Sequence, residues 1–152
     1  MPGPRKSGTV EQYASVRNAS NALHESNDCA VVAATVATNE PYEKVHGLMA
    51  ANGRRPRKGT AMAITEATLR ALGFDMVCVP HHEFLSRYPG GNLNRNITTH
   101  HPERYNNVWA DGNTYLLRTA GHILAVVNGV NVDWTRGKAL RVKVIYRVVK
   151  RA

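Results

Sequence analysis

The sequence predicts one α+β domain, in which N-terminal helices pack on a C-terminal antiparallel β-sheet. Apolar residues recur at helical spacing up to Gly73, whereas short apolar runs bounded by turn residues follow it. Helices first and closely spaced strands afterwards are typical of this fold class. The chain has 152 residues, 43% of them hydrophobic, which is enough to enclose a core. We assign residues 10–152 to this domain and residues 1–9, which carry Pro and Gly, to a flexible tail.

Capping and breaking residues divide the N-terminal half into helices. A polar run rich in capping residue types precedes Cys29, and Pro41 fits the first turn of the next helix. Thr60 is placed to cap a further helix, and glycine is expected to end the later ones. The expected helices are residues 10–16, 29–38, 41–53 and 60–73, with an irregular polar segment at 17–28.

From Phe74 onward the apolar pattern predicts strands. Asn128-Gly129 is a strong signal for a tight hairpin between two of them. Residues 81–112, rich in His, Asn, Pro and Gly, are expected to make a long surface excursion with a short helix at 82–87. Cys78 is assigned to the core. The expected strands are residues 74–79, 113–118, 122–127, 130–134 and 140–149.

The net charge of +9 predicts attraction to an acidic partner, either a protein or a nucleic acid. One basic run falls in an expected loop and is the candidate surface for such a partner. A second basic run, residues 141–151, alternates with apolar residues, which is typical of a half-buried strand. The residues of the first run are Arg54, Arg55, Arg57 and Lys58.

No apolar run reaches the ~20 residues of a membrane span, so no membrane partner is expected. The N-terminus lacks the apolar centre of a signal peptide. Two cysteines are too few for a disulfide framework and suit a reducing compartment. These features lead us to expect a cytoplasmic protein.

Cys29, His122 and Asp133 form a candidate catalytic triad. A cysteine in the first turn of a helix feels the positive end of the helix dipole, which lowers the pKa of its thiol. A histidine accepts the thiol proton and later protonates the leaving group, while a carboxylate that accepts its other N–H orients the ring. Each residue by itself has a structural alternative, as a core cysteine, a strand-start histidine or a turn aspartate. Their combination and order favour the catalytic interpretation.

The predicted hairpin places the histidine and the aspartate on adjacent strands. If the Asn-Gly pair supplies the two central turn residues, Val127 faces Val130. Asp133 then lies diagonal to His122 on the same face of the sheet. Longer side chains can bridge such a diagonal pair, so the carboxylate is expected to reach the imidazole.

A tetrahedral intermediate at Cys29 needs hydrogen-bond donors for its oxyanion. The backbone N–H of Cys29 is one candidate, and the side-chain amide of Asn27 or Asn21 is the second, with Asn27 preferred. Asn27 is equally explained as a helix-capping residue. The paired histidines at 81–82 and 100–101 lack zinc-ligand spacing, and no nucleotide-binding glycine motif is present. No metal or cofactor is therefore expected.

The segments Asn27–Val45 and Gly121–Trp134 resemble the nucleophile helix and the histidine hairpin of small papain-like proteins of phages and bacteria. In that group a Gly-His strand, a tight turn and an Asp next to a Trp recur in this form. The resemblance covers most of residues 25–75 and 113–135. It implies a papain-like fold and a catalytic site at Cys29, His122 and Asp133.

We therefore expect a papain-like cysteine hydrolase, with a peptidase acting on a peptide or isopeptide bond as the leading hypothesis. Papain-like proteases commonly carry a glutamine six residues before the cysteine, where this chain has Leu23. That departure and the net charge favour a rival, a non-catalytic papain-like module that binds protein or nucleic acid as a virion component. A third interpretation is an acyltransferase or transglutaminase-like enzyme with the same triad.

Overall fold

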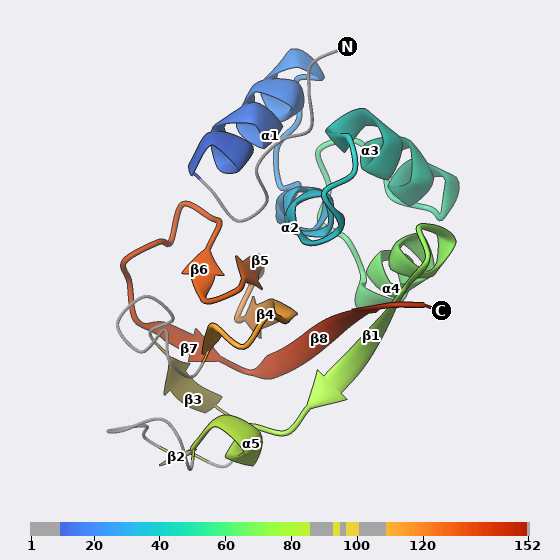
Figure 1. The fold of residues 1–152 in the computed structure, drawn as a ribbon. Helices are drawn as coiled ribbons and strands as arrows, with labels where there is room; N and C mark the ends of the chain where they lie inside the picture. Colours follow the sequence, from blue (N-terminus) through green and yellow to red (C-terminus); the bar gives the residue numbers. More distant parts are fainter. Residues whose placement is uncertain (1–9, 86–92, 95–96, 101–108, 152) are drawn as a thin grey trace.

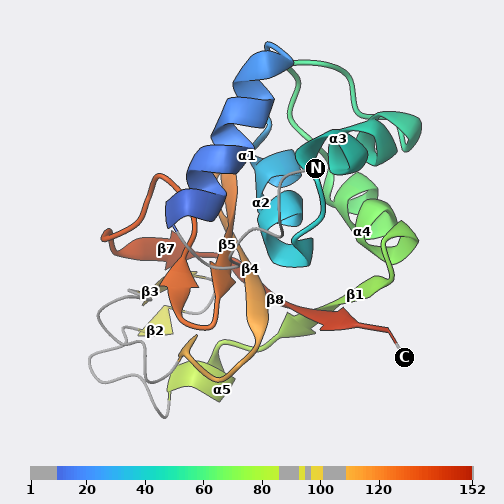
Figure 2. The ribbon, with the colours of Figure 1, turned by 45° about the horizontal axis from the view of Figure 1, so that its top comes forward.

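The computed structural model describes residues 10–85, 93–94, 97–100 and 109–151. Within them, helices α1 to α4 lie over one face of a five-stranded antiparallel sheet, and a three-stranded sheet adjoins the other face (Figures 1 and 2). The expected α+β class is confirmed, while the proposed tail at residues 1–9 lies outside the described residues. The helices are α1 (Val10–Ala22), α2 (Cys29–Thr38), α3 (Tyr42–Ala51), α4 (Met62–Ala71) and α5 (His82–Leu85).

The larger sheet has the strand order β1-β8-β4-β5-β6, and the smaller has the order β2-β3-β7. All neighbouring strands in both sheets run antiparallel. The strands are β1 (Phe74–Val79), β2 (Leu93–Asn94), β3 (Ile97–His100), β4 (Thr114–Thr119), β5 (His122–Val127), β6 (Val130–Asn131), β7 (Leu140–Val142) and β8 (Val144–Lys150).

Helix α2 is central because its residues are small and apolar on every side. Residues 30–36 are all buried, and α1, α3, α4 and β5 each contact the helix (Figure 1). Alanine and valine side chains let these neighbours approach closely, so the helix is held from several directions. Its first residue, Cys29, is therefore fixed in position relative to the sheet.

Two apolar clusters fill the two faces of the larger sheet. Leu116 and Ala125 face the helices and join the cluster that surrounds Val31. Leu117 and Leu124, one position along each strand, belong to the cluster on the opposite face. This alternation follows from the period of two along a strand. The strands β4 and β5 are thus buried on both faces and form a rigid support.

The β5–β6 turn confirms the predicted register. Asn128 and Gly129 have φ values of +46° and +83°, the positive values that a type I′ turn requires. Val127 pairs with Val130, as expected from the sequence. The strand ends at Asn131, earlier than the expected end at residue 134, and the Val132 N–H makes one further hydrogen bond, to the carbonyl of Ala125 at 3.0 Å.

Helix α1 is longer than its apolar pattern predicts, because polar residues occupy part of its buried face. It continues to Ala22 through residues that were expected to be irregular. Gln12 and Ser20 are fully buried, and both are hydrogen-bonded. The Gln12 amide donates to the carbonyl of Val36, and the Ser20 hydroxyl donates to Asp28.

The segment before β4 contains strands that the sequence did not predict. β3 pairs with β7, far along the chain, so no local signal indicates it. This pairing also explains why the expected strand 140–149 is divided at Lys143: residues before it join β3, and residues after it join β1 and β4. The predicted helix 82–87 is represented by α5, and residues 86–87 lie outside the described part of the chain.

Two further sequence assignments were wrong. Cys78 is exposed, because β1 is an edge strand in which Phe74 and Met76, but not the later positions, pack against the helical core. Thr60 does not cap α4, since the N-cap residue is Ala61 and makes no side-chain capping bond. Both errors arise where local residue types were used without knowledge of the surrounding packing.

Candidate active site

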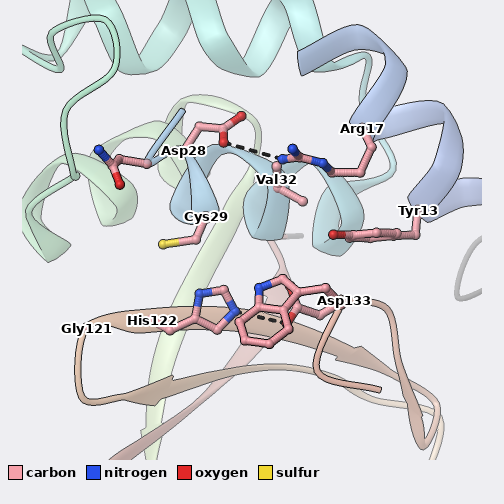
Figure 3. A pocket seen from close by; sticks show the side chains of 10 residues that line it. Tyr13, Arg17, Asp28, Cys29, Val32, Gly121, His122 and Asp133 are labelled. Carbon is pink, nitrogen blue, oxygen red and sulfur yellow. Dashed lines mark hydrogen bonds and ion pairs between the residues drawn. The ribbon is translucent and has the colours of Figure 1, made fainter. Parts of the chain in front are cut away.

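Cys29 stands at the first position of α2, and its side chain points toward the start of β5 (Figure 3). Asp28 occupies the N-cap position, but its carboxylate makes no capping bond to the helix. Instead, its Oδ2 accepts hydrogen bonds from Ser20 Oγ at 2.6 Å and Tyr42 Oη at 2.8 Å. Because no side-chain cap covers the first turn, its N–H groups keep their partial positive charge beside the sulfur.

His122 reaches this helix end because it is the first residue of β5. Thr119 and His122 pair across the β4–β5 hairpin, so the two residues between them make a two-residue turn. Gly121 has φ +77°, a conformation that glycine adopts without the steric cost other residues meet. The turn therefore places the imidazole directly opposite the start of α2 (Figure 3).

Asp133 meets the other side of the imidazole. Its Oδ2 lies 2.9 Å from His122 Nε2. The same oxygen accepts hydrogen bonds from the backbone N–H of Thr135 at 3.2 Å and from its hydroxyl at 2.7 Å. The carboxylate is only 6% exposed, so it is held in one orientation and in turn holds the ring.

Cys29 and His122 shift each other's proton affinities in the direction that nucleophilic catalysis needs, and Asp133 adds to the shift of His122. The hydrogen bonds that His122 donates to Asp133 and then to Cys29 raise the pKa of His122 from 6.5 to about 9, against the effect of burial. Burial alone raises the pKa of the Cys29 thiol, but hydrogen bonds from His122 and the backbone of Ile123 outweigh it and lower that pKa. Nε2 contacts Asp133, and the other ring nitrogen, Nδ1, lies on the side of the ring toward Cys29 (Figure 3). The arrangement favours a thiolate–imidazolium pair.

The sequence indicated Asn27 as the preferred oxyanion donor. Asn27 lies at the edge of the same site, but its side-chain amide also has a hydrogen-bond partner outside the site. Its φ is +52°, and its Nδ2 donates to the carbonyl of Arg57 at 3.2 Å. It lines the pocket in front of Cys29, whereas the alternative donor Asn21 is exposed on α1 and does not line it. The backbone N–H of Cys29, in the uncapped first turn, is the better-placed donor.

The basic loop is not the uniform surface that the sequence suggests. Arg54 is buried, and its guanidinium makes two hydrogen bonds to Glu25, at 2.8 and 3.2 Å. The same carboxylate contacts His46 and accepts the backbone N–H of Arg57. Arg54 is therefore a structural residue, and its assignment to partner binding was wrong. The exposed members of the run are Arg55, Arg57 and Lys58.

Two pockets meet at Cys29 and His122. The first has a volume of about 400 Å³ and extends over Trp134 toward α1. The second, of about 360 Å³, extends between the residues 59–62 and Arg118. Together they make a cleft that is open on both sides of the reactive pair. Such a cleft suits a chain-like substrate whose reacting carbonyl lies in the middle.

Replacing Asp133 by asparagine is expected to lower the pKa of His122 from about 9 toward its usual 6.5, because the carboxylate is the main cause of the raised value. The amide oxygen of asparagine still accepts the Thr135 hydrogen bonds, so the turn is retained. Titration of the ring by NMR in both proteins measures the change. A His122 pKa that stays near 9 in the variant would contradict the assigned role of Asp133.

Within the described ranges, no three His, Cys, Asp or Glu side chains are grouped so as to hold a metal ion. Among the same residues, none of the helices combines the length and apolar character that crossing a bilayer requires. Comparison of the chain with protein-family models, curated proteins and solved structures finds no match.

Proposed function

We propose that the protein is a papain-like cysteine hydrolase, with peptide-bond hydrolysis as its leading activity. The observation that carries the proposal is the continuous set of contacts from Cys29 through His122 to Asp133, placed between two pockets. A nucleophile at a helix start, facing a histidine at a strand start, supports the papain-like interpretation. The two free cysteines fit a cytoplasmic location, which is part of the proposal.

In the proposed reaction the Cys29 thiolate attacks the carbonyl carbon, and the carbonyl electrons move to the oxygen. The backbone N–H of Cys29 and the Asn27 amide are the proposed donors to this oxyanion. His122 gives its Nδ1 proton to the departing amine as the carbon–nitrogen bond breaks, leaving a thioester. His122 next removes a proton from water, which attacks the thioester and regenerates the thiolate. Asp133 keeps the ring oriented in both steps.

A peptide library made from a digested proteome tests this activity, with cleavage products identified by mass spectrometry. Wild type is expected to produce new termini, and Cys29→Ala to produce none, since alanine keeps the helix start but lacks the nucleophile. Cys78→Ala is the matched control, because it removes an exposed thiol that lines neither pocket. Cleavage that persists in Cys29→Ala would contradict the proposal. Amide exchange with an added amine would identify an acyltransferase instead.

A further inference from the structure

The charged groups that line the first pocket differ in their exposure. The Arg17 side chain is 39% exposed, whereas the carboxylates of Asp28 and Asp133 are 4% and 6% exposed. Both carboxylates also have close hydrogen-bond partners, the first in Ser20 and Tyr42 and the second in His122. Of these three charged side chains, the one most accessible to a ligand in this pocket is therefore the cationic Arg17.

Arg17 is held in place by an ion pair that does not use all of the N–H donors of its guanidinium. Its Nη1 lies 3.6 Å from Asp28 Oδ1, which is an ion-pair distance and longer than a good hydrogen bond. In the described part of the chain, Asp28 is its one ion-pair partner. A guanidinium has five N–H donors in a rigid fork that matches a carboxylate, so the tether orients the group and leaves donors for a ligand.

The surroundings of Arg17 complete a binding site over the reactive pair. Tyr13 and Arg17, both from α1, lie across the pocket from Cys29 and His122 (Figure 3). Trp134 is 60% exposed, and its ring lies 5.5 Å from that of His122. Lys138 Nζ lies 5.1 Å from the same indole and adds a second cation at this side. An aromatic surface flanked by cations fits an acidic side chain or a chain-terminal carboxylate.

We propose that this pocket binds a substrate carboxylate through Arg17, and that the substrates are acidic peptides. The anionic group lies on the Trp134 side of Cys29, next to the scissile bond. This inference rests on the proposed hydrolase function, which it makes more specific. The net charge of +9 adds long-range attraction for such substrates.

Alkylation of Cys29 by two reagents of different charge tests the carboxylate site without a known substrate. In both iodoacetate and iodoacetamide the thiolate sulfur bonds to the methylene carbon as iodide leaves, and only the charge of the reagent differs. The ratio of their rate constants therefore cancels the intrinsic reactivity of the thiolate. Arg17→Gln is expected to lower the iodoacetate-to-iodoacetamide ratio about three- to tenfold, as loss of a nearby charge implies.

Three variants make the result specific. Arg17→Lys keeps the charge and is expected to retain most of the ratio. Arg55→Gln removes one exposed charge from a residue that lines neither pocket, and is expected to leave the ratio unchanged. Arg118→Gln removes the arginine of the second pocket. The iodoacetamide rate of Arg55→Gln is expected to equal that of wild type, and in the other variants the ratio corrects for any change in the reactivity of Cys29.

An unchanged ratio in Arg17→Gln would overturn the proposal. An equal loss in Arg55→Gln would also overturn it, because the effect would then come from overall charge. A ratio that falls in Arg118→Gln but in no other variant would place the anion in the second pocket, which would contradict the proposal. The iodoacetamide rate of wild type tests the hydrolase separately: slow, thiol-like reaction with an Arg17-dependent ratio would reject the hydrolase and retain the carboxylate site.

Discussion

Replacement of His122 by alanine is expected to slow the alkylation of Cys29 by iodoacetamide at pH 6 by about tenfold for each unit by which His122 lowers the pKa of the thiol. The wild-type thiol has a lowered pKa because His122 donates to it, and this partner is lost in the variant. A thiol with an ordinary pKa near 8.5 is ionised to less than about 1% at pH 6. The rate of modification against pH, resolved for each cysteine by mass spectrometry, measures the effect.

Cys78 is the internal reference in the same experiment. It is exposed and belongs to neither pocket, so its rate should be the same with and without His122. Cys29 that follows an ordinary thiol profile in both proteins would mean that no thiolate–imidazolium pair exists. That outcome would favour the non-catalytic module, and the salt dependence of nucleic-acid binding would be the next measurement.

Replacement of Glu25 by glutamine is expected to lower the free energy of unfolding by about 3 to 5 kcal/mol. Glu25 and Arg54 are each only 2% exposed in their side chains, and the variant leaves the guanidinium buried without its counter-charge. Urea unfolding followed by circular dichroism measures the loss. Glu40→Gln is the matched control, since its pair with Lys44 is exposed and is expected to contribute about 0.5 kcal/mol or less.

Acid should abolish the contribution that the ion pair between Glu25 and Arg54 makes to the free energy of unfolding. The hydrogen bonds from Arg54 and His46 lower the pKa of Glu25 from 4.5 to about 2, against the effect of burial. A depressed carboxyl pKa stabilises the fold above the unfolded value of 4.5, and this stabilisation is lost as pH falls toward 2. The difference in the free energy of unfolding between wild type and Glu25→Gln should therefore be constant around neutral pH and should become smaller below pH 4.5. A gap that stays constant down to pH 2 would contradict the ion-pair explanation.

The parts of the site that the sequence predicts are those specified by short-range rules. Ala/Val-rich composition marks α2 as a buried helix with Cys29 at its start. The Asn-Gly turn fixes the register of its hairpin, and register places Asp133 near His122. The helix and the hairpin are each formed by residues that are close in the sequence, so the pattern along the chain contains the needed information; the contact between Cys29 and His122 is distant in the sequence and was expected from their combination and order.

The parts that the sequence did not predict depend on contacts between distant segments. Arg54 resembles a solvated loop residue until the fold places it beside Glu25, which lies before α2. Gln12 and Ser20 interrupt the apolar pattern of α1 because their partners lie on or next to another helix. Cys78 has the neighbours of a core residue, but its strand lies at the edge of the sheet. Polarity of a residue alone does not reveal such partners.

The position of α2 early in the chain and of β5 late in it has a consequence for biosynthesis. As the polypeptide leaves the ribosome, the helices emerge before the hairpin that carries His122. Until that hairpin docks beneath α2, Cys29 has no imidazole beside it and remains an ordinary thiol. We therefore expect Cys29 to react as an ordinary thiol in a nascent chain, and its raised reactivity to appear only after the hairpin has been synthesised and has docked. The order of synthesis thus delays the activation of the proposed nucleophile until the fold surrounds it.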